Sequence, residues 1–332
     1  MQRLIRGTIA ILLLAACDST PPPVSELPRT FNIDRARITV SGVSSGAYMA
    51  GQLHIAHASL VNGAALIAGG PYACAGGSMQ TALGPCIKGG DIGLDSLAGR
   101  IQSYADNGQI DDPAELRDDR VWIFHGASDH VVDKSVSQAA AGLYTRFVDA
   151  NDVAFVDTVK VVHGMPTVSV GQPCDEMSAP FLNACDYDAA GELLQHLYGP
   201  LSAPATTATE LQTISQATWE DAQFWDLAYL YVPEDCQSGA SCGLHVAFHG
   251  CRQSGEFVGD AYATGAGYNE WAETNRLIVL YPQVRSSKLA PLNPLGCWDW
   301  WGYTNEEYAT RKGRQITAVR AMVDLLMRSR SR

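Results

Sequence analysis

The sequence predicts an α/β fold in which a mostly parallel central sheet is flanked by helices. The main observation is that short β-branched or apolar runs alternate with helical stretches, which is the pattern of parallel βαβ units. A second observation is that polar residues follow several of these runs, at the strand ends where parallel sheets place functional groups. The chain has 332 residues, of which 46% are hydrophobic, and this is enough apolar material for a large core.

The N-terminal residues have the pattern of an export signal and are set apart from the fold. Arg3 and Arg6 precede a short apolar run, Ile9–Leu14, and the following Ala15-Ala16-Cys17 resembles the end of a bacterial lipoprotein signal. We therefore expect a signal peptide over residues 1–16, lipid on Cys17, a Pro/Ser-rich tether over residues 17–29 and one folded domain over residues 30–332. The alternative is an ordinary secretory peptide with a chance cysteine. In both cases we expect export, as a periplasmic or cell-surface lipoprotein or as a secreted protein.

The first half of the domain alternates strands with helices. A β-branched run beginning at Ile38 leads into a glycine turn, and the small and apolar residues of Ala47–Leu60 predict a helix that packs closely on a sheet. The glycine-rich segment Cys74–Gly99 is expected to be a loop. The other predicted elements are strands at Gly63–Gly70, Val121–Asp129 and Val153–Val162, and helices at Ser96–Asp106 and Ser135–Asn151.

The second half begins with a segment of different character. Cys174–Trp219 holds one short helix, Ala189–Leu197, followed by Pro- and Thr-rich sequence, so we interpret it as a connector that covers part of the site. Pro291–Tyr303 is an aromatic loop. The other predicted elements are strands at Leu227–Pro233, Leu244–Cys251 and Leu277–Tyr281, and helices at Gly265–Asn275 and Glu306–Met327.

The first strand ends in Gly42-Val43-Ser44-Ser45-Gly46, which fits the G-x-S-x-G nucleophile elbow. A serine on a sharp strand-to-helix turn projects its hydroxyl out of the backbone, and the two glycines leave room where a Cβ would clash. Ser44 occupies the nucleophile position. The backbone N–H of Ser45 is then free to face a developing oxyanion.

Ser44, Asp129 and His163 follow predicted strands in the order nucleophile, acid, base that is typical of α/β-hydrolases. A serine nucleophile needs a base to accept its proton, and the base needs a group that fixes its tautomer. Asp133 competes with Asp129 for the acid position, but it also fits a helix N-cap. The other histidines are assigned to packing, to the surface or to shaping the site: His54, His57, His125, His130, His196, His245 and His249.

The oxyanion hole needs a second backbone donor, which in most α/β-hydrolases comes from a strand before the nucleophile. No predicted strand precedes the elbow strand. The best candidate is the turn His249-Gly250-Cys251, far later in the chain. This placement predicts a circularly permuted α/β-hydrolase.

Nine cysteines are present, and setting Cys17 aside for lipid leaves eight, an even number that suits an oxidising compartment. Their spacing favours three local disulfides and one distant one, although other connectivities remain open. The favoured pairs are Cys74–Cys86, Cys174–Cys185, Cys236–Cys242 and Cys251–Cys297.

Charge and ligand spacing exclude several classes of partner. The formal net charge is −12 and no long basic run is present, so we expect no nucleic-acid partner. The cysteines and histidines lack zinc-ligand spacing, and we expect neither a metal nor another cofactor. Contact with a membrane is expected only through the N-terminal lipid.

Five motifs together make the chain resemble the extracellular poly(3-hydroxybutyrate) depolymerases, most closely their single-domain, circularly permuted type. The resemblance implies Ser44, Asp129 and His163 as the catalytic residues and the amides of Ser45 and Cys251 as oxyanion donors. It also implies that the tryptophan loop, Trp301 above all, with Trp298 and Tyr303, forms part of a polyester-binding crevice. The motifs are Gly42–Met49, Ser128-Asp129, His163–Thr167, His249–Gln253 and Asn293–Tyr303.

The expected function is that of a serine esterase that hydrolyses poly(3-hydroxybutyrate) or its oligomers through an acyl-enzyme. Many depolymerases carry a separate C-terminal binding domain, and the end of this sequence at Arg332 favours amorphous polymer or soluble oligomers. One alternative is a carbohydrate esterase of the acetylxylan or feruloyl type. Another is a lipid-anchored binding protein without activity. The tryptophans also have an alternative role, since large aromatic side chains often bury for packing alone.

Overall fold

The structure, a computed structural model, describes residues 30–327. The expected signal peptide and the whole expected tether, including Cys17, therefore lie outside the described residues. Among the residues that are described, no helix is both long and apolar enough to cross a bilayer.

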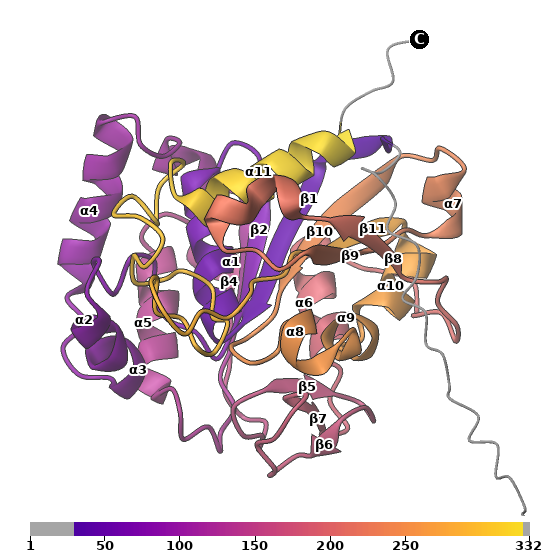
Figure 1. The fold of residues 1–332 in the computed structure, drawn as a ribbon, viewed down its shortest axis with the longest axis horizontal. Helices are drawn as coiled ribbons and strands as arrows, with labels where there is room; N and C mark the ends of the chain where they lie inside the picture. The colour runs from indigo at the N-terminus through magenta and orange to yellow at the C-terminus, as the bar shows by residue number, and fades with distance from the viewer. Residues whose placement is uncertain (1–29, 328–332) are drawn as a thin grey trace, which may run out of the picture.

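The core of the molecule is an eight-stranded sheet with the order β4-β3-β2-β1-β10-β11-β9-β8 (Figure 1). The six strands from β4 to β11 are parallel, while β9 runs antiparallel to β11 and β8 antiparallel to β9. The predicted mostly parallel sheet is thus confirmed, with an antiparallel pair at one edge. The strands are β1 (Ile33–Val43), β2 (Gly63–Ile67), β3 (Arg120–Phe124), β4 (Val153–Val156), β8 (Gln212–Ser215), β9 (Leu227–Tyr231), β10 (Cys242–Phe248) and β11 (Leu277–Tyr281).

Helices cover both faces of this sheet, because its strands carry apolar side chains on both faces. In β2, for example, Ala64 and Leu66 belong to one core cluster, while Ala65 and Ile67 belong to the other. One cluster includes α1 (Ser45–Ala56), α4 (Leu94–Asp106), α5 (Lys134–Tyr144) and α11 (Arg314–Met327), and the other includes α6 (Ala189–Tyr198), α9 (Ala261–Gly265) and α10 (Tyr268–Asn275).

Four more short helices lie in the connections, and two of them correct an expectation. The segment expected to be a loop from Cys74 to Gly99 contains α2 (Met79–Leu83) and α3 (Pro85–Lys88), and α4 begins within it. Ser78 caps α2 through its side chain, and Pro85 occupies the first turn of α3, so local capping chemistry starts both helices. The others are α7 (Glu234–Gln237) and α8 (Gly255–Val258).

Residues 163–185 form a second, three-stranded sheet below the main one in Figure 1. It consists of β5 (Met165–Thr167), β7 (Leu182–Ala184) and β6 (Gln172–Pro173), in that order. The expected connector therefore contains β7, which pairs with β5 and β6 of the small sheet, and the edge strand β8, which pairs with β9. Several predicted elements are also shorter than expected: β4 ends at Val156 and α11 begins at Arg314.

The parallel strands bring the site residues to one edge of the sheet. Gly42 at the end of β1 pairs with Phe248 of β10 and with Leu66 of β2. The segments that follow β1, β10, β3 and β4 therefore leave the sheet on the same side, and these segments carry the candidate residues.

Candidate active site

Ser44 lies in the sharp turn between β1 and α1. Its backbone adopts φ 57° and ψ −118°, a conformation that costs free energy in a residue other than glycine. The flanking glycines are required: a Cβ on Gly42 would lie 2.1 Å from the carbonyl oxygen of Gly46, and a Cβ on Gly46 would lie 2.4 Å from the oxygen of Phe248. The close approach of three backbone segments thus explains the G-x-S-x-G spacing.

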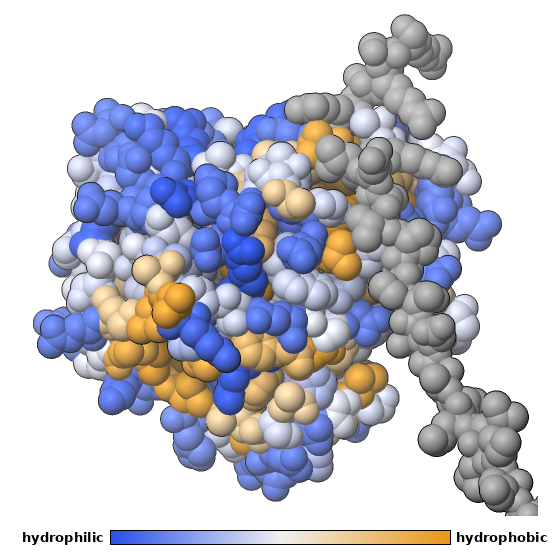
Figure 2. Space-filling model, viewed as in Figure 1, coloured by the Kyte–Doolittle hydropathy of each residue, from blue (hydrophilic) through white to orange (hydrophobic). Residues whose placement is uncertain are grey.

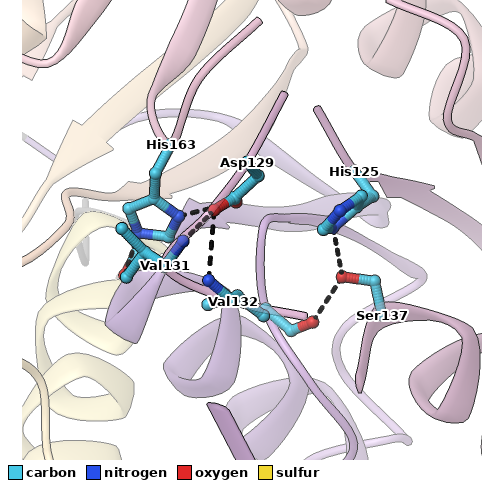
Figure 3. Close-up of polar contacts among 8 residues, drawn as sticks. His125, Asp129, Val131, Val132, Ser137 and His163 are labelled. Carbon is cyan, nitrogen blue, oxygen red and sulfur yellow. Dashed lines mark hydrogen bonds and ion pairs between the residues drawn. The ribbon is translucent and has the colours of Figure 1, made fainter. Parts of the chain in front are cut away.

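The structure brings Ser44, His163 and Asp129 into one chain of hydrogen bonds. Figure 3 shows the part of this chain that joins His163 to Asp129. Nδ1 of His163 lies 2.8 Å from Oδ2 of Asp129, and Nε2 lies 2.8 Å from Oγ of Ser44. A carboxylate only accepts, so Nδ1 carries the proton and Nε2 is left to accept the Ser44 hydroxyl proton. This arrangement can activate a serine for attack on a carbonyl carbon.

The carboxylate of Asp129 is fully buried but well satisfied. Its Oδ1 accepts hydrogen bonds from the amides of Val131 at 2.8 Å and Val132 at 3.1 Å. Burial acts to raise the pKa of Asp129, but the hydrogen bonds from His163 and the two amides outweigh it and leave the pKa below its usual value. Asp129 is therefore ionised at neutral pH and holds one orientation of the imidazole.

The residues that competed for these positions have other roles in the structure. Asp133 is the N-cap of α5 and accepts a hydrogen bond from the amide of Ser135 at 2.9 Å. His125 is buried beside Ser137, with 3.3 Å between Nδ1 and Oγ (Figure 3). His245 is buried between the hydroxyls of Thr39 and Ser41, and burial lowers its pKa to about 3. None of the three contacts Ser44.

The turn that follows β10 lies against the elbow. A Cβ on Gly250 would lie 3.6 Å from the Cβ of Ser44, and Cys251 lines the same cavity as Ser44 and Ser45. Ser45 begins α1, so its N–H has no partner within the helix and lies at the positive end of the helix dipole. The structure thus places both predicted oxyanion donors beside the serine.

Two buried side chains fix this turn. His249 donates from Nδ1 to the carbonyl of Gly250 at 2.7 Å and accepts from the amide of Val284 at Nε2, and burial lowers its pKa to about 4 despite the Gly250 hydrogen bond. Gln253 accepts from the amide of Gly250 at 2.7 Å and donates to the carbonyls of Pro180 and Phe181. Gln253 therefore joins the turn to the small sheet. Gln253 belongs to the motif His249–Gln253, but no role was predicted for it from the sequence.

Ser44 opens into a cavity of about 400 Å³. Its walls are mostly apolar and come from the elbow, from α2 and α3, from the 177–181 segment and from the loop before α11. The apolar lining on α2, Met79 and Leu83, lies in the segment that was expected to be a loop. Such a cavity fits a weakly polar ligand.

The tryptophan loop corrects two expectations. Trp298 does not line the cavity: it has 0% exposure and packs edge-on against Phe224 and Phe248 in the core. Tyr303 does not line it either, because its hydroxyl is turned to the carbonyl of Cys297 and the side chain of Gln315.

Trp301 does line the cavity, as expected, and so does Trp300, which was not among the predicted site residues. Trp300 stacks on Tyr48 of α1, with ring centroids 4.3 Å apart. The loop is organised by the buried carboxylate of Asp299, which accepts from the amides of Gly302, Tyr303 and Thr304. The Trp-Asp-Trp-Trp sequence was the available signal, but it does not reveal which rings face inward.

Among residues 30–327 the structure contains four disulfides, and they join the cysteines that were paired from the sequence. They are Cys74–Cys86, Cys174–Cys185, Cys236–Cys242 and Cys251–Cys297. The last one ties the turn after β10 to the tryptophan loop. Within residues 30–327, no group of three or more His, Cys, Asp or Glu side chains is arranged to hold a metal ion.

Comparison with known proteins gives two curated relatives. A polyhydroxybutyrate depolymerase of Talaromyces funiculosus is 34% identical over 328 residues, which cover 94% of this chain and 95% of the relative. The chain belongs to the polyhydroxybutyrate depolymerase family. A poly(3-hydroxybutyrate) depolymerase of Delftia acidovorans is 38% identical over 330 residues, or 96% of this chain, and the chain spans 65% of the length of that relative. No protein-family model matches the chain.

Solved depolymerase structures share the fold. A PHB depolymerase from Penicillium funiculosum matches with a TM-score of 0.86 and 33% identity, covering 91% of this chain and 99% of its own. A serine-to-alanine variant of a PHB depolymerase, in complex with an R3HB trimer, matches with the same TM-score, identity and coverage.

Proposed function

We propose that this chain is a serine esterase that hydrolyses poly(3-hydroxybutyrate) or its oligomers through an acyl-enzyme. The observation that carries the proposal is the hydrogen-bonded chain of Ser44, His163 and Asp129 at the floor of an apolar cavity. Membership of the depolymerase family supports the substrate class, as does the R3HB trimer bound by a solved structure that matches this chain.

In the proposed mechanism, Nε2 of His163 removes the Ser44 proton while Oγ attacks an ester carbonyl carbon. The amides of Ser45 and Cys251 stabilise the negative charge that develops on the carbonyl oxygen. His163 then gives the proton to the leaving alcohol oxygen, the C–O bond breaks, and Ser44 holds the acyl group. His163 next deprotonates a water molecule, which attacks the acyl carbonyl carbon. The bond between this carbon and Oγ of Ser44 then breaks, the hydroxy acid leaves, and His163 returns the proton to Ser44.

The surface around the cavity supports a polyester substrate. Figure 2 shows hydrophobic residues gathered on the face that carries α2, α3 and the loop before α11 in Figure 1. An exposed hydrophobic patch of this kind usually marks a binding site, and a weakly polar polymer bound there would cover these residues. The exposed large hydrophobic residues that form part of the cavity wall are Met79, Leu83, Val131, Met177, Leu292 and Leu295. A sugar ester would find few hydrogen-bonding groups on these walls.

We also propose that the fold is a circularly permuted α/β-hydrolase. In the usual order, the strand that supplies the second oxyanion donor precedes the nucleophile strand. Here β1 carries the serine, and its sheet neighbour β10 carries the Gly250-Cys251 turn much later in the chain. Spatial adjacency combined with reversed chain order supports the permutation.

The division of the chain is part of the same proposal. Residues 1–16 would be a lipoprotein-type signal peptide, residues 17–29 a tether attached through a lipid on Cys17, and residues 30–332 the catalytic domain. The four disulfides support an oxidising compartment outside the cytosol. Mass spectrometry of the mature N-terminus tests the lipid on Cys17.

Replacing Ser44 with Ala tests the function. The Ser44→Ala variant is expected to lose hydrolysis of amorphous poly(3-hydroxybutyrate) and of soluble trimer, and also labelling by a fluorophosphonate, while its thermal unfolding stays near that of the wild type. Ser59→Ala, at a surface serine that bonds Asp111, is the matched control and should keep full activity. Retained hydrolysis in the Ser44→Ala variant, or wild-type turnover confined to acetylated or feruloylated sugars, would refute the proposal.

A further inference from the structure

Arg252 carries a charge that the proposed mechanism does not use. It follows Cys251 directly and is the one Lys, Arg, Asp or Glu residue among the described residues that line the cavity. Its guanidinium lies over the ring of Phe181, 5.0 Å from the centroid. Within residues 30–327, the guanidinium makes no salt bridge and no side-chain hydrogen bond to the protein, and the residue is exposed. Its donors are therefore free.

Arg252 has an unfavourable backbone conformation in this position. Arg252 has φ 58° and Phe181 also has φ 58°, both in the left-handed region that disfavours residues with a Cβ. The Arg252 amide donates to the carbonyl of Leu295 at 2.7 Å, which fixes the strained residue against the loop before α11. Two strained residues that meet at the mouth of one cavity point to a functional constraint rather than to chance.

We infer that Arg252 binds the terminal carboxylate of a hydroxyalkanoate oligomer, on the leaving-group side of the scissile ester. This inference rests on the proposed function. A guanidinium presents two parallel N–H donors that match the two oxygens of a carboxylate, and stacking on Phe181 orders the group without using those donors.

The polarity of the substrate determines the side. In a chain of 3-hydroxyacids, the acyl fragment that remains on Ser44 ends in a hydroxyl, and the alcohol fragment that departs ends in the free carboxyl. Arg252 lies next to Cys251, whose amide is the proposed oxyanion donor, so a short leaving fragment brings its carboxylate within reach of the guanidinium. An ester in the interior of a long polymer has no such carboxylate nearby.

The net charge of the chain also supports a role for Arg252 in binding an anionic substrate. The chain has a formal net charge of −12, so its overall field repels an anionic oligomer. A single unneutralised guanidinium in an otherwise apolar wall provides the local attraction that such a substrate needs. Arg252 therefore favours cleavage near the carboxyl end of oligomers over cleavage inside long chains.

The test compares the 3-hydroxybutyrate trimer as a free acid with the same trimer as its methyl ester, at neutral pH. The wild type is expected to have a kcat/KM about tenfold higher for the acid, as a solvent-exposed charge-assisted hydrogen bond allows. Arg252→Gln should bring this ratio close to one by slowing only the acid, and Arg252→Lys should keep part of the preference. Arg35→Gln, at the opposite end of β1, is the control and should behave as the wild type.

A binding measurement separates recognition from turnover. In the Ser44→Ala background, calorimetry should show tighter binding of the acid than of the methyl ester, and Arg252→Gln should remove the difference. Equal wild-type activity on both trimers, or an Arg252→Gln variant that loses activity on both alike, would overturn the inference and leave Arg252 as a packing partner of Phe181. Failure of the folded wild type to cleave either trimer would instead refute the proposed function, and the inference with it.

Discussion

Replacing Gln253 with Met would test whether the turn after β10 must be held in place for catalysis. Gln253 is 1% exposed and fixes the turn through three hydrogen bonds, one from the amide of Gly250 and two to the carbonyls of Pro180 and Phe181. Methionine has a similar length and no hydrogen-bonding amide. The substitution therefore leaves the volume of the site nearly unchanged and removes the bracing.

The size of the effect follows from these contacts. The carbonyl of Phe181 also accepts from the amide of Met165, so the main uncompensated loss is the buried N–H of Gly250. Leaving one such group unsatisfied costs about 1–3 kcal/mol of stability. The adjacent Cys251 amide would lose its alignment, and since removal of an oxyanion donor costs about 10²–10³ in kcat, a displaced donor should cost about 10–100-fold.

Gln216 provides a matched control. It is also 1% exposed, donates to the backbone carbonyls of Trp225, Leu227 and Gln283, and accepts from the amide of Gln283, but it does not line the cavity. We expect Gln216→Met and Gln253→Met to lower the unfolding temperature comparably. Only Gln253→Met should lower kcat for the trimer, with KM changing less. An unchanged kcat in Gln253→Met, or an equal loss in both variants, would show that the bracing is merely structural.

Two further predictions concern charge. Asp129→Asn should lower kcat about 10⁴-fold with little change in KM, because an amide does not enforce the His163 tautomer; steady-state kinetics on the trimer will show it, and a loss below tenfold would contradict the assigned role. His57, His245 and His249 are buried, and burial is the main cause of their lowered pKa values of about 4, 3 and 4. A lowered histidine pKa gives stability that is present above the unfolded value of about 6.5 and is lost as pH falls towards the folded value, at up to about 1.4 kcal/mol per pH unit for each residue. Urea unfolding at pH 7, 6 and 5 should show this decline, and a flat unfolding free energy over that range would exclude it.

The elements that the sequence predicted well are those in which one local rule dominates. The elbow follows from glycine spacing, and Ser44, Asp129 and His163 follow from their positions after strands of a parallel sheet. The positions of these three residues need only chain order and sheet polarity. The role of the Cys251 amide came instead from the family resemblance.

The roles of individual side chains in the loops were harder to predict. Trp298, Trp300 and Trp301 have the same chemistry, and only the packing of the loop around Asp299 decides that the first is buried and the other two face the cavity. Gln253 acts through backbone groups of the small sheet, whose strands are too short to give a periodic pattern. The positions of these side chains are determined by tertiary contacts, which a local sequence pattern does not encode.

The disulfide between Cys251 and Cys297 has a consequence for when the enzyme becomes competent. Thiols stay reduced in the cytosol, so a newly made chain would lack the covalent link between the Gly250-Cys251 turn and the tryptophan loop until export. The two walls of the cavity would then be joined only by weaker contacts. We therefore expect the cavity to take its final shape only in an oxidising compartment.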